Sequence, residues 1–262
     1  MGNIVTENLR YRGIDLNYKV AGDGPTLLLL HGANGSRSFS PIVEDLSKHF
    51  RVILPDHPGF GDTKQAKWIS TIPDLAYFYL DIIQAMNLDN VNLVGHSMGG
   101  WIAAEIALRD SHNINSLTLI SSAGLSVEGT PMGDLFSWSP EEAASQVFAR
   151  KEFIDEMLAK VPNEDERLLM ASNREMAKLL CHEAQFQNPE IKKWAHRLNK
   201  PALILWGDSD GIFPEPFAHA FHNMISNSQL EIYKDCGHVP MLEARERFLQ
   251  RLINFIQIFS TL

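Results

Sequence analysis

The feature that most constrains the fold is a regular alternation along the chain. Short apolar runs that end near Gly, Asp or His alternate with longer segments in which apolar residues recur at helical spacing. This alternation is typical of successive βα units, which build a mostly parallel sheet with helices on both faces. We expect an α/β fold with an eight-stranded sheet, and we place the strands at residues 14–21, 26–30, 51–54, 91–94, 117–120, 202–206 and 230–233, with a weaker first strand near 4–11.

The alternation is interrupted once. After Gly124 no strand pattern returns until about residue 200, and the sequence between is helical in character. Helix-start signals occur at Ser139, which is followed by a proline and two glutamates, and at Asn163, which precedes an acidic run. We predict that residues 125–199 form a helical cap inserted into an α/β core made of residues 1–124 and 200–262. A chain of 262 residues is long enough for one such domain with an insertion.

Composition excludes several classes of partner. The formal net charge of −9 disfavours nucleic acid, because a hold on phosphates needs clustered Lys and Arg. No apolar run approaches the roughly 20 residues that span a bilayer, and the first residues lack the layout of a secretory signal. With only two cysteines, Cys181 and Cys236, we expect free thiols. We therefore expect a cytoplasmic protein that acts on a small molecule, and we take the N-myristoylation pattern at residues 1–6 as a chance match.

Residues 95–99 carry the strongest chemical signal, because they read Gly-His-Ser-Met-Gly between a predicted buried strand and a predicted helix. Small residues on both sides of a serine permit the strained turn that leaves its hydroxyl exposed above the sheet edge. A helix N-terminus also favours a developing oxyanion. We predict that Ser97 is a catalytic nucleophile, the alternative being a serine that only shapes the turn.

A serine hydroxyl needs a base to remove its proton, and the base needs a carboxylate to orient it. His238 lies in the loop after the last predicted strand, at the same sheet edge as Ser97. Asp208 and Asp210 both follow the strand at 202–206. We favour Asp210, which lies further into its loop and can reach His238, while Asp208 is expected to cap the turn. The order Ser, Asp, His along the chain is the one typical of this arrangement.

A developing oxyanion needs two hydrogen-bond donors, and we assign them to the backbone N–H groups of Ala33 and Met98. Ala33 follows the strand at 26–30, and Met98 follows the nucleophile. Asn34, His96 and Trp138 are candidates for substrate binding. Their structural alternatives are a turn for Asn34, packing beside the elbow for His96, and packing between cap and core for Trp138.

The other histidines do not indicate a metal site. His57, in the Asp-His-Pro-Gly-Phe-Gly loop at 56–61, is interpreted as hydrogen-bonded scaffold. Several more lack the spacing of metal ligands, namely His182, His196, His219 and His222. We expect neither a metal nor another cofactor.

Taken together, these motifs resemble the α/β-hydrolase superfamily over essentially the whole chain, specifically the branch with a helical cap inserted after the sixth strand. The resemblance rests on the residues at 31–32, 56–61, 95–100, 206–210 and 237–240. It implies Ser97 as nucleophile, Asp210 as acid and His238 as base. Haloalkane dehalogenases and epoxide hydrolases of this branch carry aspartate at the nucleophile position, so Ser97 argues against both.

Three functions follow from the resemblance. The leading one is a carboxylesterase that cleaves small esters through an acyl-enzyme. The second is a hydrolase of carbon–carbon bonds in ring-fission products, which shares the Ser-Met-Gly-Gly elbow but usually has asparagine in place of His96 and tryptophan in place of Val239. Such an enzyme needs a cation in the cap, for which the candidates are Arg150, Arg174 and Lys178. The third is a ligand receptor on the same fold that turns over little or no substrate.

Overall fold

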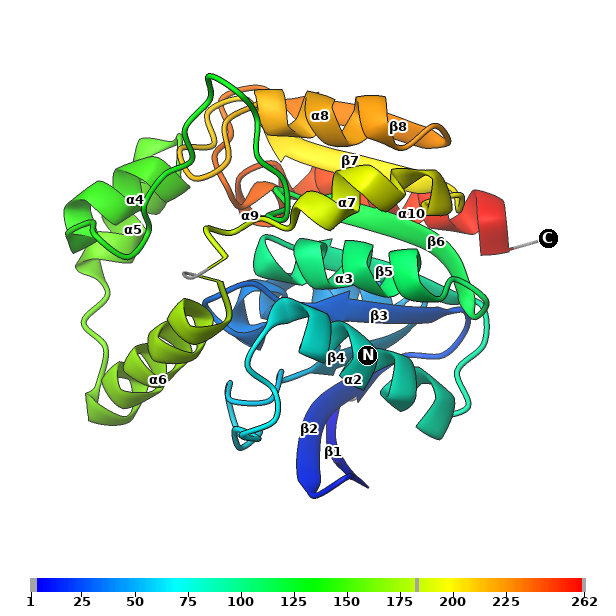
Figure 1. Ribbon diagram of the computed structural model, residues 1–262. Coiled ribbons are helices and arrows are strands. Elements are labelled where there is room, and N and C mark those ends of the chain that lie inside the picture. Colours follow the sequence, from blue (N-terminus) through cyan, green and yellow to red (C-terminus); the bar gives the residue numbers. More distant parts are fainter. Residues whose placement is uncertain (1–3, 182–183, 261–262) are drawn as a thin grey trace.

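An eight-stranded sheet organises the computed structural model, which describes residues 4–181 and 184–260 (Figure 1). The strands lie in the order β1-β2-β4-β3-β5-β6-β7-β8. Strands β1 and β2 pair antiparallel, β2 is antiparallel to β4, and the remaining pairs are parallel. Their bounds are β1 Val5–Tyr11, β2 Ile14–Ala21, β3 Thr26–Leu30, β4 Arg51–Pro55, β5 Val91–His96, β6 Ile114–Ile120, β7 Ala202–Gly207 and β8 Ser228–Tyr233. The predicted fold class is confirmed.

Two strands begin earlier than the apolar pattern predicts. Strand β6 starts at Ile114 rather than 117, and β8 starts at Ser228 rather than 230. The added residues are mostly polar, but their side chains find partners: the Ser116 hydroxyl donates to Asn92 Oδ1 at 2.8 Å. Because a ladder is built from backbone groups, polar residues join a strand once their side chains are satisfied.

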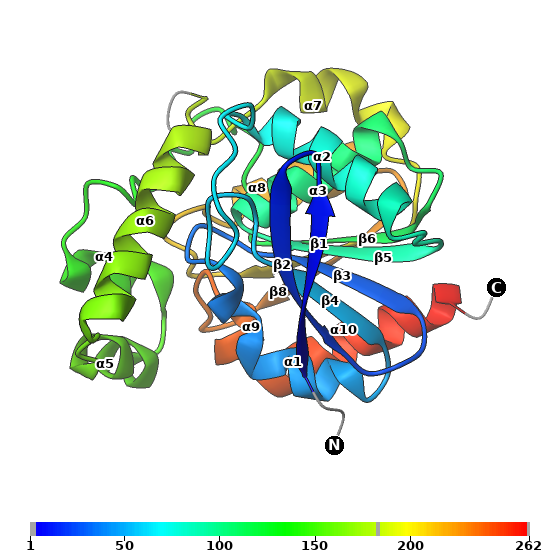
Figure 2. The same cartoon turned by 90° about the horizontal axis from the view of Figure 1, so that it is seen from below.

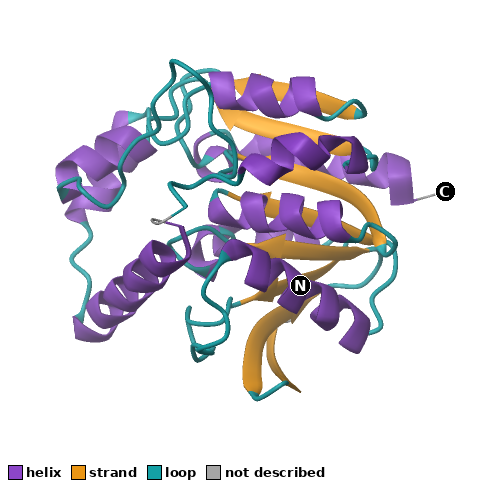
Figure 3. Ribbon diagram, viewed as in Figure 1, coloured by secondary structure: helices purple, strands orange, loops and turns teal. Residues whose placement is uncertain are grey.

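Helices cover both faces of the sheet (Figure 2). One face carries α1, α9 and α10, and the other carries α2, α3, α7 and α8, so that helix and strand layers alternate (Figure 3). Their bounds are α1 Ser40–Ser47, α2 Ile72–Ala85, α3 Met98–Arg109, α7 Pro189–Trp194, α8 Pro216–Met224, α9 Pro240–Glu243 and α10 Arg245–Ser260, with short 3₁₀ turns η1 Ser36–Ser38 and η2 Ala195–Arg197. Cys181 and Cys236 are buried and free of disulfides.

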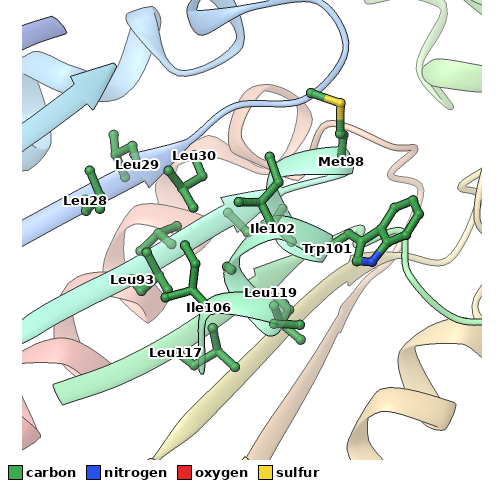
Figure 4. Close-up of a cluster of buried hydrophobic side chains, with 14 of the residues drawn as sticks. Leu28, Leu29, Leu30, Leu93, Met98, Trp101, Ile102, Ile106, Leu117 and Leu119 are labelled. Carbon is green, nitrogen blue, oxygen red and sulfur yellow. The ribbon is translucent and has the colours of Figure 1, made fainter. Parts of the chain in front are cut away.

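Helix α3 is the central helix of the core. Ile102 and Ile106 project from it among leucines of the central strands, including Leu30, Leu93 and Leu119 (Figure 4). These side chains are fully buried, and burying a residue of this size stabilises the fold by roughly 1.5–3 kcal/mol. The packing fixes where α3 begins, and the nucleophile candidate immediately precedes it.

The segment between β6 and β7 carries α4 Pro140–Val147, α5 Lys151–Ala159, α6 Glu164–Cys181 and α7. Ser139 forms a capping box with Glu142, and Asn163 Oδ1 accepts from Glu166 N at 2.9 Å, so both predicted helix starts are confirmed. Helices α4, α5 and α6 lie beyond the carboxyl ends of the parallel strands, whereas α7 runs along α3 (Figure 1). Within the described ranges, none of the helices has the length and apolar character needed to cross a bilayer.

Candidate active site

Ser97 occupies a strained turn between β5 and α3. Its backbone angles are φ 56° and ψ −120°, in a region that few non-glycine residues adopt. The turn needs small neighbours: a Cβ added to Gly99 would lie 1.9 Å from the Leu30 carbonyl oxygen. The Ser97 carbonyl accepts hydrogen bonds from Gly100 N at 2.9 Å and Ala123 N at 3.1 Å. This strand–turn–helix arrangement holds the half-buried serine side chain above the sheet edge, as the sequence predicts.

Asp210 and His238 form a buried pair. His238 Nδ1 lies 2.9 Å from Asp210 Oδ2, and Asp210 Oδ1 accepts from the N–H groups of Ile212 and Phe213 at 2.9 and 3.0 Å. A carboxylate can only accept, so Nδ1 carries the proton and Nε2 is left as the acceptor. Asp208 is instead exposed and accepts from the Ser209 hydroxyl at 2.8 Å. Of the two aspartates that the sequence offers, Asp210 is therefore the partner of His238.

His96 joins the turn at Ser97 to the loop of His238. Its Nε2 donates to the His238 carbonyl oxygen at 3.0 Å, and the two ring centroids are 4.9 Å apart. Burial, reinforced by the nearby His238, lowers the pKa of His96 to about 3, so its ring is neutral at pH 7. Phe39 packs edge-on against the same ring. The contacts that His96 makes in the structure are thus with the protein, and substrate binding by His96 stays a prediction.

The loop after β3 passes beside Ser97. A Cβ added to Gly32 would lie 3.0 Å from the Ser97 Cβ, so Ala33 comes from a segment in close contact with the elbow. Met98 is the first residue of α3, and the N–H groups of a first helical turn have no partner within the helix. The two assigned oxyanion donors therefore belong to segments that meet at Ser97.

Helix α6 rests on the loop that carries Ala33 and Asn34. Asn173 Nδ2 donates to the Asn34 carbonyl at 3.4 Å, and Asn173 Oδ1 accepts from Gly61 N at 3.3 Å. Asn173 is buried, whereas Asn34 is exposed. Sequence reasoning missed Asn173, although an asparagine within a helix is a signal that its side chain has a specific partner.

His31 and His57 hold two loops together beneath the site. The rings stack at 3.7 Å, His57 N donates to His31 Nε2 at 3.1 Å, and His57 Nε2 donates to the His31 carbonyl at 3.0 Å. The Tyr79 hydroxyl donates to His57 Nδ1. Both imidazoles are fully buried and face protein groups. This arrangement agrees with the interpretation of His57 as scaffold.

A row of aromatic rings leads from the segment between β6 and β7 to His238. Phe136 stacks on Phe186 at 5.5 Å, Phe186 meets Phe213 at 6.4 Å, and Phe213 meets His238 at 5.8 Å. Trp138 is half-buried and packs closely on Gly133, whose N–H donates to the Ile212 carbonyl at 2.8 Å. Sequence reasoning missed Phe186 and Phe213, which come from segments far apart in the chain and meet only in the folded protein.

Comparison with known families agrees with this geometry. The family model described as the alpha/beta hydrolase fold matches residues 25–244, which covers most of the chain. The chain belongs to the α/β-hydrolase family. It is a hydrolase on this fold, and its neighbours place it with the serine hydrolases.

The relatives of this α/β hydrolase carry several descriptions. It is 28% identical over 261 residues to the 2-hydroxy-6-oxo-2,4-heptadienoate hydrolase of Pseudomonas putida, with 92% of each chain covered. It is 27% identical to Lipase 3 of a Moraxella species, covering 84% of this chain and 74% of the lipase. Among solved structures it is similar to a serine hydrolase involved in carbazole degradation, with 26% identity, a TM-score of 0.75, and 98% and 100% of the two chains covered.

Three buried imidazoles make the folded hydrolase sensitive to acid. Burial lowers the pKa of His31 to about 4 and that of His96 to about 3, and it lowers the pKa of His57 well below its ordinary value. In the unfolded chain these groups take up protons as pH falls through about 6.5. The unfolded state therefore binds more protons between about pH 6.5 and pH 4, and the free energy of unfolding falls as pH is lowered through that window.

We expect the free energy of unfolding to fall by several kcal/mol across this window, since each unit of pKa difference is worth about 1.4 kcal/mol. Urea unfolding at a series of pH values from about 7 to 4.5 measures it. Burial raises the pKa of Glu243, so this group makes the free energy of unfolding rise as pH falls. We expect the three histidines together to outweigh this single group. His96→Asn should flatten the pH profile, and His49→Asn, at an exposed site, should leave it unchanged. A constant free energy over this range would contradict the prediction.

Proposed function

We propose that this hydrolase cleaves small carboxylic esters through an acyl-enzyme on Ser97. The observation that carries the proposal is the buried Asp210–His238 pair, which is joined through His96 to the strained turn of Ser97. A serine in such a turn, a histidine with a free acceptor nitrogen and a buried carboxylate are the parts that acyl transfer through serine requires.

In the first half of the reaction, His238 Nε2 takes the proton from the Ser97 hydroxyl as its oxygen attacks the ester carbonyl. The carbonyl oxygen becomes an oxyanion, which the N–H groups of Ala33 and Met98 stabilise. Removing one donor of this kind typically costs about 3 kcal/mol of barrier. The intermediate collapses when the ester C–O bond breaks, and His238 gives its proton to the leaving alcohol.

In the second half, a water molecule takes the place of the alcohol. His238 removes a proton from the water, the hydroxide attacks the acyl carbonyl, and the Ser97–acyl bond breaks as the proton returns to the Ser97 oxygen. Asp210 accepts from His238 Nδ1 throughout and stabilises the imidazolium that forms twice in each turnover. The products are the free acid and the regenerated serine.

The surroundings of His238 favour an uncharged acyl group. The aromatic row through Phe213 is apolar, whereas cleavage of a ring-fission product requires a cation for the substrate carboxylate. Arg174 Nη2 donates to the Phe136 carbonyl at 2.7 Å, and Arg150 Nε donates to the Asp235 carbonyl at 3.1 Å, so both candidate arginines are engaged with the backbone. Lys178 is exposed on α6.

The carbon–carbon hydrolase is kept as a second candidate because of the Pseudomonas putida relative. That protein is named as a hydrolase of 2-hydroxy-6-oxo-2,4-heptadienoate, and the match covers 92% of each chain. We further propose that residues 125–199 act as a cap, with α4, α5 and α6 above the site. Asn34 and Trp138 would then line the space between cap and core and contact the substrate.

A substrate panel separates the candidates. We measure kcat/KM for p-nitrophenyl esters from acetate to octanoate and for a 2-hydroxy-6-oxo-dienoate, whose cleavage is monitored by the loss of its absorbance. The proposal predicts that kcat/KM for the esters is higher than that for the dienoate by about tenfold or more. Faster turnover of the dienoate would assign the carbon–carbon reaction instead. Negligible turnover of both, with thermal stabilisation by either compound, would favour the receptor.

A further inference from the structure

The geometry points to Glu243 as a positioning residue for the reaction, holding the loop of His238 and the inserted segment in one fixed arrangement. Its Oε2 accepts from Gly237 N at 2.6 Å, and its Oε1 accepts from Ala149 N and Arg150 N at 3.0 and 2.9 Å. One carboxylate thus binds both the residue before the base and the chain between α4 and α5. The inference rests on the proposed function, because it takes His238 as the base.

We define residues 146–150, at the junction of α4 and α5, as the strap. The strap contacts both loops of the proposed acid–base pair. The Gln146 carbonyl accepts from Gly211 N at 3.0 Å, next to Asp210, and the Val147 carbonyl accepts from His238 N at 2.7 Å. Through Glu243 the strap is also linked to Gly237. A shift of the strap would therefore move both loops.

Three polar groups of His238 are held by hydrogen bonds: its backbone N–H, its carbonyl and its ring Nδ1. Its N–H is held by Val147, its carbonyl by His96 and its Nδ1 by Asp210. Glu243 secures the preceding peptide at Gly237, where no side chain fits: an added Cβ would lie 2.2 Å from the Val147 carbonyl oxygen. A displacement of about 1 Å at a reacting group can lower a rate by about 100-fold. The contact at Gly237 is thus positioned to affect turnover.

The three bonds require a carboxylate. Glu243 is 3% exposed, and its two oxygens receive three backbone donors. Glutamine has the same shape but only one acceptor oxygen, so its amide group would point N–H donors at a backbone N–H. A buried donor left without a partner is costly. Glu243→Gln therefore breaks one side of the bridge while preserving its volume.

The experiment compares Glu243→Gln and Glu243→Ala with Glu246→Gln, which removes an equal charge from the exposed first turn of α10. For Glu243→Gln we expect kcat on a p-nitrophenyl ester to fall by about tenfold to 100-fold, with KM changed less than about twofold. Amide hydrogen exchange should quicken in peptides covering residues 146–150 and 235–238 but not in those covering β5 and α3. Glu246→Gln should match the wild type, and Glu243→Ala should show the larger loss.

The inference is overturned if Glu243→Gln keeps kcat within about twofold of the wild type, or if exchange quickens equally across the whole chain, which would indicate a general loss of stability. Exchange is measured without substrate. If the wild type fails to hydrolyse esters, the proposed function fails, yet local exchange and the rate of Ser97 labelling by a fluorophosphonate still decide whether Glu243 positions the His238 loop.

Discussion

Replacement of Ser97 by alanine is expected to lower kcat for ester hydrolysis by about 10⁴-fold or more. The substitution removes the oxygen that forms the acyl-enzyme and leaves the remaining groups in place. The Ser97 backbone forms hydrogen bonds with Ile120, Gly100, Trp101 and Ala123. Since these do not involve the hydroxyl, thermal unfolding of Ser97→Ala should stay close to that of the wild type.

The matched control for this loss is Ser209→Ala, which removes a hydroxyl from an exposed position on the loop of Asp210. That hydroxyl donates to Asp208 and takes no part in the proposed chemistry. Its kcat should lie within about twofold of the wild type. Residual activity of Ser97→Ala above one tenth of the wild-type rate, in protein free of wild-type contamination, would mean that another group is the nucleophile.

Replacement of Asp210 by asparagine should cause the second-largest loss, about 10⁴-fold in kcat. The Asp210 carboxylate accepts from His238 Nδ1 at 2.9 Å while its other oxygen receives two backbone N–H groups. If the asparagine oxygen keeps those two donors, its NH₂ group faces His238, and the ring must place its proton on Nε2. His238 then can no longer accept the proton of Ser97.

Asp208→Asn is the control for charge, because Asp208 lies two residues away and is exposed. Steady-state kinetics of the two variants should give nearly wild-type kcat for Asp208→Asn and almost none for Asp210→Asn. Equal losses would indicate that negative charge in this loop matters rather than the bond to His238. A larger loss in Asp208→Asn would reverse the choice between the two aspartates.

The fold could be predicted because its signals are local. Apolar runs place the strands, and the caps at Ser139 and Asn163 mark two helices between β6 and β7. The strained turn is also marked locally, by the glycines at 95 and 99, although the contact that excludes a side chain at Gly99 is with the Leu30 carbonyl on β3. Local patterns do not predict that β6 and β8 begin with polar residues. These residues join a strand because their side chains find partners such as Asn92 on a neighbouring strand.

The candidate site likewise combines residues that the sequence predicts with residues that it does not. Position along the loop was enough to favour Asp210 over Asp208, because only the deeper residue can reach across to the next loop. The roles of Glu243 and Phe186 could not be predicted from the sequence, because each meets a residue from a distant segment: Glu243 accepts from Ala149 N, and Phe186 packs against Phe213. A single acidic residue within the apolar run after His238 was the one available sign of Glu243.

The most direct test of the central claim is covalent labelling by a fluorophosphonate, with activity and mass followed together. An activated serine displaces fluoride from phosphorus, whereas an ordinary serine hydroxyl does not react. We predict one phosphonate per chain, located by peptide mapping at Ser97, with ester hydrolysis lost in proportion to labelling and no labelling of Ser97→Ala. Full ester hydrolysis by completely labelled protein, or a label on another residue, would contradict the assignment of Ser97 as the nucleophile.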